Sequence, residues 1–255
     1  MIEKHATDDA RRCVLSCPNG RMVVLEQVEE ERACNETLAE MARTGKEEGY
    51  ALFAETRENG LLPNGAPGLF LSILVRPGIH ARKAGILSAV AAVAAARAIE
   101  KTSDTKITIR WVNDLFSPQH KLAAMMTSGR ITPNGYLDYA VIGISIALSP
   151  EDFRPKLGDV IRQVFSDESK TLSTRLTEHV LLEFFTIYDR MLTDRTFLAE
   201  YRMRCAGLIG RRVRVLSAGK YVRAHVSHID DNALLVVRLR DGRELTVSSR
   251  SDIVF

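Results

Sequence analysis

The stretch that most constrains how this chain can fold is an alanine-rich segment at residues 80–101, which contains ARKAGILSAVAAVAAARAIEK. Alanine has the highest helix propensity of the common residues, so the segment is predicted to be one helix. Its apolar residues lie almost all round the helix axis instead of forming a single stripe. A helix of that kind needs cover on most sides, and we therefore expect it to be buried inside a larger domain.

The size and composition of the chain are those of an ordinary soluble protein. Its 255 residues allow one large domain, or a main domain with a small one. Hydrophobic residues make up 45% and charged residues 26%, which is typical of globular domains. The net charge of +3 is too small to indicate nucleic-acid binding by composition alone. The sequence has no membrane-length apolar run and no apolar signal-peptide core at its start, so we expect a cytoplasmic protein.

The four cysteines do not follow a zinc-binding pattern. Cys13 and Cys17 are close enough to clip a loop or hold a metal, but no matching His or Cys pair follows them, as it does in zinc sites. Free thiols in a reducing compartment are the simpler interpretation, also for Cys34 and Cys205. No metal site is predicted.

Strand and helix signals alternate along the first 206 residues. Strands are predicted at 22–28, 50–55, 69–77, 107–111, 121–129 and 139–149. Helices are predicted at 33–45, 80–101, 172–192 and 197–206. In the third helix Leu176, Val180, Phe184 and Ile187 share one face. The Gly-, Pro- and Asn-rich residues 56–68 are predicted to form a loop.

The pattern changes at Gly207 to short β segments separated by turns, among them an Asp241–Gly242 hairpin signal. About fifty residues of this kind predict a small SH3-like β-barrel. The fold class is therefore α+β, with a main domain at 1–206 and a β domain at 207–255. The β domain has basic residues that we expect to form a solvated face and not a nucleic-acid site: Arg211, Arg212, Arg214, Lys220 and Arg223. Its two histidines, His225 and His228, are expected to be ordinary surface or core residues.

The residues with most chemical potential lie in ITIRWVNDLFSPQHKLAAMM, residues 107–126. Arg110 and Lys121 are cations that can hold a carboxylate or a phosphate. Trp111 can be a core residue or can stack on a flat ligand. Asn113 and Asp114 stand at a predicted turn, where such side chains often only cap the backbone. From these residues alone, a hairpin with a polar turn is as good an interpretation as a ligand site; Met125 and Met126 are predicted to be strand core.

The order of the segments resembles the biotin protein ligases, whose strand-turn-strand signature is Lys-Trp-Pro-Asn-Asp, a short turn, then Lys-Leu/Ile-Ala/Gly-Gly. The other segments that carry the resemblance are ACNETLAEMA (33–42), ALFAET (51–56), GLFLSILVRP (68–77) and YAVIGISIAL (139–148). The resemblance extends from about residue 22 to 254. It implies a class II synthetase-like mixed sheet flanked by helices, an SH3-like C-terminal barrel and no N-terminal DNA-binding domain.

The resemblance also implies an activity. The family joins the carboxylate of biotin to ATP with the help of Mg²⁺, and passes biotin from biotinyl-5'-AMP to a lysine of a biotin carboxyl carrier domain. The implied partners are thus biotin and that carrier domain, without DNA or membrane, and a homodimer is left open. Lys121 matches the lysine that contacts the biotin carboxylate and the adenylate phosphate.

Other positions match the family's ligand-binding motifs. Arg110 replaces the first lysine of the signature, and Trp111, Asn113 and Asp114 are retained. Asn35 matches the last residue of the Ser-Thr-Asn helix start. Gly143 matches the first glycine of the later Gly-Ile-Gly-Ile-Asn strand.

The motifs also depart from the family pattern. The nucleotide loop, rich in Gly and Arg in the family, is short here; it starts with Thr56 in place of Gln and has one arginine, Arg57. Ser-Thr of the helix start is Ala33–Cys34. Ala124 replaces a glycine, and its methyl group would narrow a slot shaped for a flat ring.

Three interpretations follow from this mixture. The chain is an active, divergent biotin protein ligase, a catalytically impaired relative that serves as a binding or regulatory partner, or a ligase for another small carboxylic acid. Loss of ring-polar contacts and phosphate donors favours the second and third interpretations, because a site built to hydrogen-bond its ligand loses affinity with each donor.

Overall fold

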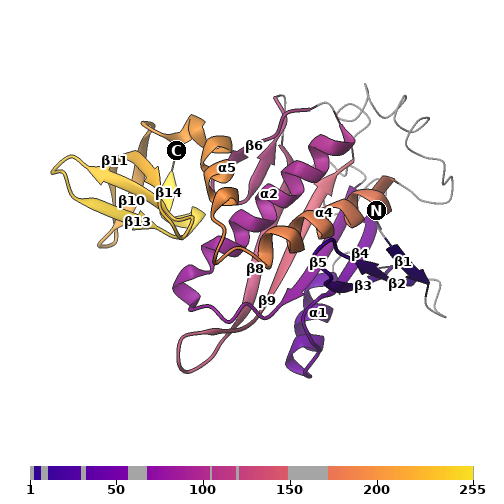
Figure 1. Cartoon of the computed structure of the whole chain (residues 1–255). Helices are drawn as coiled ribbons and strands as arrows, with labels where there is room; N and C mark the ends of the chain where they lie inside the picture. Colours follow the sequence, from indigo (N-terminus) through magenta and orange to yellow (C-terminus); the bar gives the residue numbers. More distant parts are fainter. Residues whose placement is uncertain are drawn as a thin grey trace.

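The computed structural model describes residues 3–6, 11–29, 33–56, 68–103, 105–118, 121–148 and 172–254. Its body is a nine-stranded mixed sheet in the order β1-β2-β3-β4-β5-β9-β8-β7-β6 (Figure 1). Neighbouring strands are antiparallel except for β3 and β4, which are parallel. The strands are β1 (Glu3–Ala6), β2 (Arg12–Ser16), β3 (Met22–Gln27), β4 (Tyr50–Thr56), β5 (Gly68–Val75), β6 (Thr108–Arg110), β7 (Asp114–Phe116), β8 (Lys121–Ile131) and β9 (Leu137–Ala147).

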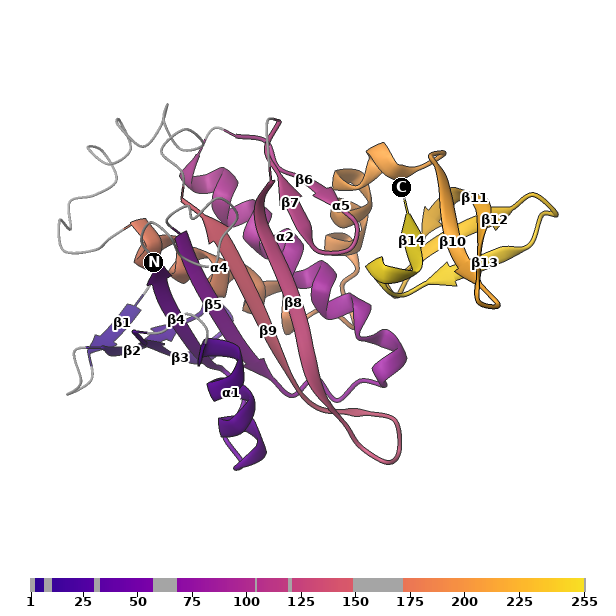
Figure 2. The same cartoon turned by 180° about the vertical axis from the view of Figure 1, so that it is seen from behind.

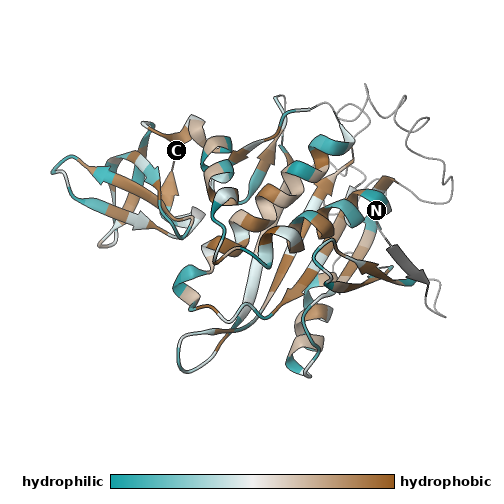
Figure 3. Ribbon diagram, in the orientation of Figure 1, coloured by the Kyte–Doolittle hydropathy of each residue, from teal (hydrophilic) through white to brown (hydrophobic). Residues whose placement is uncertain are grey.

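One face of this sheet is covered by three helices, α2 (Gly85–Thr102), α4 (Leu172–Tyr188) and α5 (Thr196–Arg204). The prediction that the alanine-rich helix is buried on most sides is confirmed, since 13 of the 18 residues of α2 are buried. Small alanine side chains let α4 and α5 pack closely against it. Figure 3 shows hydrophobic residues along α2 and the central strands. We call this side of the sheet the closed face.

Among the described residues, the opposite face carries one helix, α1 (Ala33–Arg43). Its Leu38 and Ala42 pack against a smaller apolar cluster on the sheet, formed by residues such as Tyr50, Leu74 and Val141. Gly45 ends the helix segment with a φ of 96°, a conformation that glycine adopts without strain. We call this side the α1 face.

The C-terminal module is a five-stranded antiparallel sheet in the order β13-β12-β11-β10-β14. Its strands are β10 (Arg212–Ser217), β11 (Lys220–Ile229), β12 (Leu235–Leu239), β13 (Glu244–Val247) and β14 (Ile253–Val254). The closed SH3-like barrel that the turn spacing predicts is not formed, because the strands described for residues 212–254 show no pairing between β13 and β14. The mixed α+β class itself is confirmed.

The module packs directly against the body. The indole N–H of Trp111 donates to the carbonyl of Ala233 at 3.0 Å, and Tyr201 donates to the carbonyl of Val112 at 2.8 Å. A Cβ at Gly85 would lie 2.6 Å from the carbonyl oxygen of Asn232, so the first turn of α2 needs a glycine there.

Two further predictions from the sequence are corrected. The segment 113–120, predicted as a turn, contains the short strand β7, which the sequence conceals because Leu115 is its single buried residue. Strands β1 and β2 precede the strand that we predicted to be first. The other predicted helices and strands agree with the structure within a few residues, and the loop predicted at 56–68 lies outside the described residues except at its two ends. No helix in the described parts of the chain has the length and apolarity needed to cross a membrane.

Candidate functional site

The candidate site lies on the α1 face, where β5, β9, β8, β7 and β6 run side by side (Figure 2). The register of these strands places residues from distant segments in one row. Phe70 pairs with Ser145, Ser145 with Ala124, Ala124 with Asp114, and Asp114 with Arg110. A signature that looks like a turn in the sequence therefore continues a row of small and polar residues across the sheet.

A second row, one step along the strands, holds a polar pair. Ser72 pairs with Gly143, and the Ser72 hydroxyl donates to Oδ1 of Asn35 at 2.6 Å. A Cβ at Gly143 would lie 2.5 Å from Nδ2 of Asn35, closer than any real side chain can approach. Only glycine at 143 leaves room for the Asn35 amide over the sheet.

Between α1 and the sheet the described residues enclose a cavity of about 160 Å³. We call it the Asn35 cavity. It is lined by Cys34, Asn35, Phe70, Leu71, Ser72, Ala124, Met125, Met126, Gly143, Ile144 and Ser145. Asn35, Ser72 and Ser145 are its polar members, while the rest of the lining is apolar. Sites for drug-sized ligands commonly measure about 300–1,000 Å³, so this cavity suits the head group of a ligand rather than a whole one.

The charged groups of the site lie beside this cavity on β6, β7 and β8. Lys121 Nζ lies 2.7 Å from a carboxylate oxygen of Asp114. The Lys121 side chain is 38% exposed and that of Asp114 25%, so the pair stands at the surface, within reach of a ligand. The guanidinium of Arg110 lies 4.0 Å from the centre of the Phe116 ring, a cation–π contact that leaves its N–H groups available for an anion.

The distance between the charged pair and the cavity follows from strand geometry. Asp114, the partner of Lys121, pairs directly with the cavity residue Ala124, so the charged pair stands one strand away from the cavity wall, about 5 Å between neighbouring strands. A ligand with a flat polar head in the Asn35 cavity and a carboxylate on a flexible tail would bring that carboxylate to Lys121.

Comparison with known proteins agrees with this geometry. No family model matches the chain. In sequence it is 24% identical over 178 residues to the bifunctional ligase/repressor BirA of Bacillus subtilis, a match that covers 69% of this chain and 55% of BirA. The chain thus spans about half the length of the curated relatives it matches.

In three dimensions a mutant of the biotin protein ligase from Aquifex aeolicus, solved in complex with biotin, superposes with a TM-score of 0.64. The two chains share 15% identity, over 90% of this chain and 97% of that one. This chain has the biotin protein ligase fold. The Aquifex aeolicus ligase in complex with biotin and ATP gives a TM-score of 0.63 at 15% identity, over 90% and 97%. A biotin protein ligase-like protein of unknown function from Silicibacter gives 0.64 at 13%, over 88% and 94%.

Within this ligase fold, two residues that the resemblance marks as ligand-binding have structural roles. Trp111 is fully buried, and its indole holds Ala233 of the C-terminal module. The Asn113 side chain donates to the carbonyl of Met125, and the Met125 N–H donates back to the Asn113 carbonyl at 2.9 Å. The polar bend is therefore held to β8 at Met125, and the ligand contacts predicted for Trp111 and Asn113 stay predictions.

The sequence also singles out Thr56, Arg57 and Met126, and neither Thr56 nor Met126 is among the polar residues of the cavity. Thr56 ends β4, where its backbone pairs with Gly68, and Arg57 lies outside the described residues. Met125 is buried as predicted, but Met126 is 57% exposed, because alternate residues of β8 face opposite sides of the sheet. The prediction of Met126 as core is therefore wrong; its side chain borders the cavity.

Ser72 is the residue of the site that sequence reasoning missed. It lies in LFLSILV, a strand whose other residues are all apolar. A hydroxyl in such a run needs a hydrogen-bond partner once it is buried, and that requirement is the signal that could have identified it. All four cysteines are buried, and none of them is joined in a disulfide within the described residues.

Proposed function

We propose that this chain acts as a divergent biotin protein ligase, which binds biotin in the Asn35 cavity and activates its carboxylate with ATP. The observation that carries the proposal is the polar Asn35–Ser72 pair over Gly143, on the same sheet face as Lys121. Solved structures with this fold bind biotin and ATP. The resemblance of the signature at 107–126 supports the same substrates.

The reaction needs a cation between two anions, the carboxylate of biotin and the α-phosphate of ATP. The carboxylate oxygen attacks the α-phosphorus of ATP, the bond to pyrophosphate breaks, and biotinyl-5'-AMP forms. The amine of a carrier-protein lysine then attacks the acyl carbon and AMP leaves. Lys121 would neutralise the carboxylate and the phosphate during the first step. Arg110 stands one row away to hold a phosphate oxygen.

This assignment requires Lys121 to exchange partners. In the structure it is paired with Asp114, and a half-exposed pair of this kind contributes at most about 1 kcal/mol. An incoming carboxylate can therefore replace Asp114 at small cost. Mg²⁺ would shield the phosphate charge and would come with the nucleotide, since the described residues contain no cluster of three or more His, Cys, Asp or Glu side chains that could hold it. Near Lys121, Asp114 is the carboxylate that could contribute one ligand.

A second candidate function is binding without catalysis. The small volume of the Asn35 cavity and the methyl group of Ala124 on its wall favour a smaller or less polar acid than biotin. In that case the chain would be a binding or regulatory relative of the ligases, or a ligase for another small carboxylic acid.

Calorimetric titration with biotin and then ATP tests both candidates. We expect biotin to bind, ATP to be consumed and pyrophosphate to be released. Lys121→Ala should abolish pyrophosphate release and leave the head-group contacts in the cavity intact. Lys83→Ala, an exposed lysine in the 3₁₀ turn Ala81–Lys83 before α2, is the matched control and should behave as wild type.

Two outcomes would reject the ligase proposal. Biotin binding without any pyrophosphate release would assign the chain to the non-catalytic function. Heat of binding from octanoate or lipoate, but none from biotin, would assign the cavity to another acid.

A further inference from the structure

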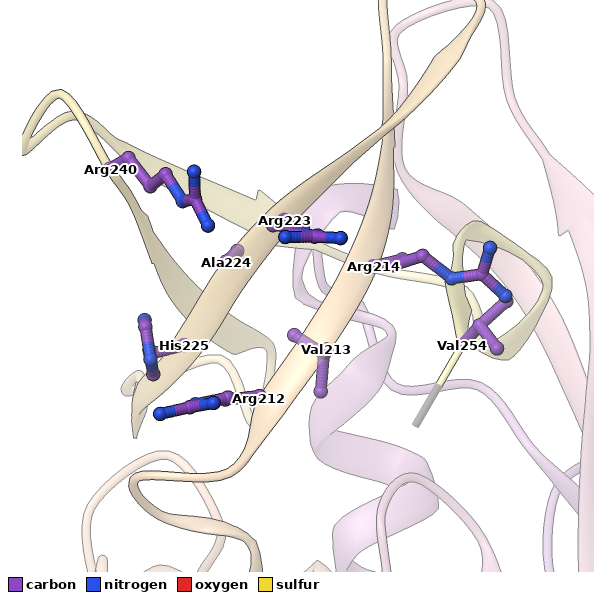
Figure 4. Close-up of a pocket in the computed structure, with 8 residues that line it drawn as sticks. All are labelled: Arg212, Val213, Arg214, Arg223, Ala224, His225, Arg240 and Val254. Atoms are coloured by element: carbon purple, nitrogen blue, oxygen red, sulfur yellow. The ribbon is translucent and has the colours of Figure 1, made fainter.

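A groove lined by arginines crosses the C-terminal sheet (Figure 4). Its volume is about 590 Å³ and its lining consists of Arg212, Val213, Arg214, Arg223, Ala224, His225, Arg240 and Val254. We call it the basic groove. It lies on a different sheet from the Asn35 cavity, and no residue lines both.

The strand register places three arginines of the basic groove on two facing strands. Arg214 stands directly opposite Arg223, and Arg212 opposite His225. All four side chains are exposed, while the alternate residues of both strands are buried in the core. Like charges in directly opposed positions destabilise a sheet. The folded module therefore keeps this arrangement at a cost.

That cost is not offset inside the module. Residues 207–255 hold nine Lys and Arg against five Asp and Glu, a net charge of +4 that exceeds the +3 of the whole chain. The five acidic side chains are engaged elsewhere: Asp231 with Arg202, Asp241 with Arg243, Glu244 with Arg238, Asp230 with backbone N–H groups, and Asp252 with the Ser251 hydroxyl. Within the described residues, no carboxylate lies at ion-pair distance from Arg212, Arg214, Arg223 or Arg240.

The arginines do not converge on one point. Figure 4 shows Arg212 and His225 on one side of the groove, Arg214 beside Val254 on the other, Arg223 between them, and Arg240 apart at the upper left. Side chains two apart on one strand face are about 6.6 Å apart, so the positive charge is drawn out along β10 and β11. This spread suits an extended polyanion better than a compact one such as a single phosphate.

The next pair along the same two strands is Leu216 and Tyr221, 44% and 50% exposed. An exposed tyrosine at the end of a row of arginines offers a ring on which a base can stack. A protein partner fits less well, because the positive charge drawn out along β10 and β11 needs a partner that is negative along the same length, as a phosphodiester backbone is.

We infer that the basic groove binds the phosphodiester backbone of single-stranded nucleic acid, with Tyr221 stacking on a base. Arginine guanidinium groups bind phosphate oxygens through two parallel hydrogen bonds. This replaces the expectation from the sequence that these residues form only a solvated face. The inference does not depend on the proposed ligase function, since the two sites share no residue.

Fluorescence anisotropy with short labelled single-stranded RNA and DNA tests it on the full chain. Neutralising four phosphates gives a salt slope of about −3, so affinity should fall about 50-fold between 50 and 200 mM salt. Arg214→Ala and Arg223→Ala should each weaken binding and make the slope shallower by about 0.7. Tyr221→Ala should weaken binding about 5- to 10-fold with the slope unchanged.

Arg43→Ala is the matched control, because it removes the same charge from an exposed site on α1 and should bind as wild type. Arg214→Lys retains the charge and should keep the salt slope. Absence of saturable binding at low salt would overturn the inference. So would equal sensitivity of Arg43→Ala and Arg214→Ala, or an acidic polypeptide that binds the groove as tightly as the oligonucleotides.

Discussion

The two faces of the nine-stranded sheet differ in what covers them. The closed face lies under three helices, and its residues on β5 are Leu69, Leu71, Ile73 and Val75, all fully buried. In the described part of the chain the α1 face lies under one short helix, and on β5, β8 and β9 it carries Ser72, Ala124, Gly143 and Ser145. The strands are shared, so alternate residues of one stretch of chain serve two purposes.

The contrast shows where stability and recognition reside. Close packing of large apolar side chains on the closed face supplies most of the folding free energy. Small side chains on the α1 face leave room for the Asn35 amide and for a ligand, and contribute less to stability. Substitutions on the two faces should therefore have separable effects.

The largest effect is expected on the closed side. Trp111→Ala would leave a cavity in the core and break the hydrogen bond to Ala233, and should lower the free energy of unfolding by about 3–5 kcal/mol. Urea denaturation followed by circular dichroism measures it. Trp111→Phe retains most of the volume and should cost less. A loss below about 1 kcal/mol for Trp111→Ala would show that this core is not as closely packed as the burial indicates.

On the α1 face, Gly143→Ala should act on binding more than on folding. The new methyl group would meet Asn35 at 2.5 Å and push its amide away from Ser72. We expect biotin affinity to fall at least about tenfold, with a stability loss of about 1–2 kcal/mol. Gly207→Ala is the control, because a Cβ at Gly207 would meet nothing within 4 Å. If Gly143→Ala bound biotin with unchanged affinity, Asn35 would not be a ligand-binding residue.

The helices of the closed face are also tied together by charge. Arg204 of α5 binds Glu100 of α2 at 2.8 Å and Glu200 at 2.9 Å. Burial alone would raise the pKa of the Glu100 and Glu200 carboxyl groups. Hydrogen bonds and charge attraction from Arg204 lower it, and Arg97 does the same at Glu200, so that both pKa values lie below the usual value.

A lowered pKa in the folded state fixes the sign of the pH dependence. The stabilisation is complete at pH values above the unfolded-state pKa near 4.5 and is lost as pH falls through the folded-state value. The urea midpoint should therefore drop below about pH 4.5. Arg204→Met should be less stable at neutral pH and show a smaller drop in acid. An equal drop in both proteins would mean that other carboxylates set the acid limit.

The smallest effect is expected from a substitution that enlarges the Asn35 cavity on the α1 face. Ala124→Gly removes the methyl group on the cavity wall and should raise biotin affinity a few-fold. Because glycine in a strand costs about 0.5–1 kcal/mol, the variant should be slightly less stable. Calorimetry with biotin gives the first quantity and urea denaturation the second. Weaker binding would show that Ala124 contacts the ligand instead of limiting it.

Most elements of the fold could be read from the sequence because their signals are local. The alanine-rich helix, the helix face of Leu176 and Val180, and the Asp241–Gly242 hairpin follow from propensity, periodicity and turn chemistry within short windows. The order of the motifs also predicted the biotin protein ligase fold. Strand β7 escaped because three residues with one buried side chain carry too little signal.

The site was predicted in part. Asn35, Gly143, Ala124 and Lys121 were identified by motif position, and the structure brings the first three together around one cavity. Trp111 and Asn113 have the residue types of ligand contacts, but the Trp111 indole bonds Ala233 and the Asn113 amide bonds Met125 of β8. A residue type alone does not reveal which neighbour forms a hydrogen bond with its side chain.

The sequence by itself determined the helices, most strands and the set of candidate residues, since these depend on interactions between residues near each other in the chain. The tertiary structure alone decided that Ser72 holds Asn35, that Asp114 holds Lys121, and that Trp111 reaches Ala233, 122 residues away. It also set Arg214 opposite Arg223. Each of these contacts depends on strand register and on packing between distant segments, which no local pattern specifies.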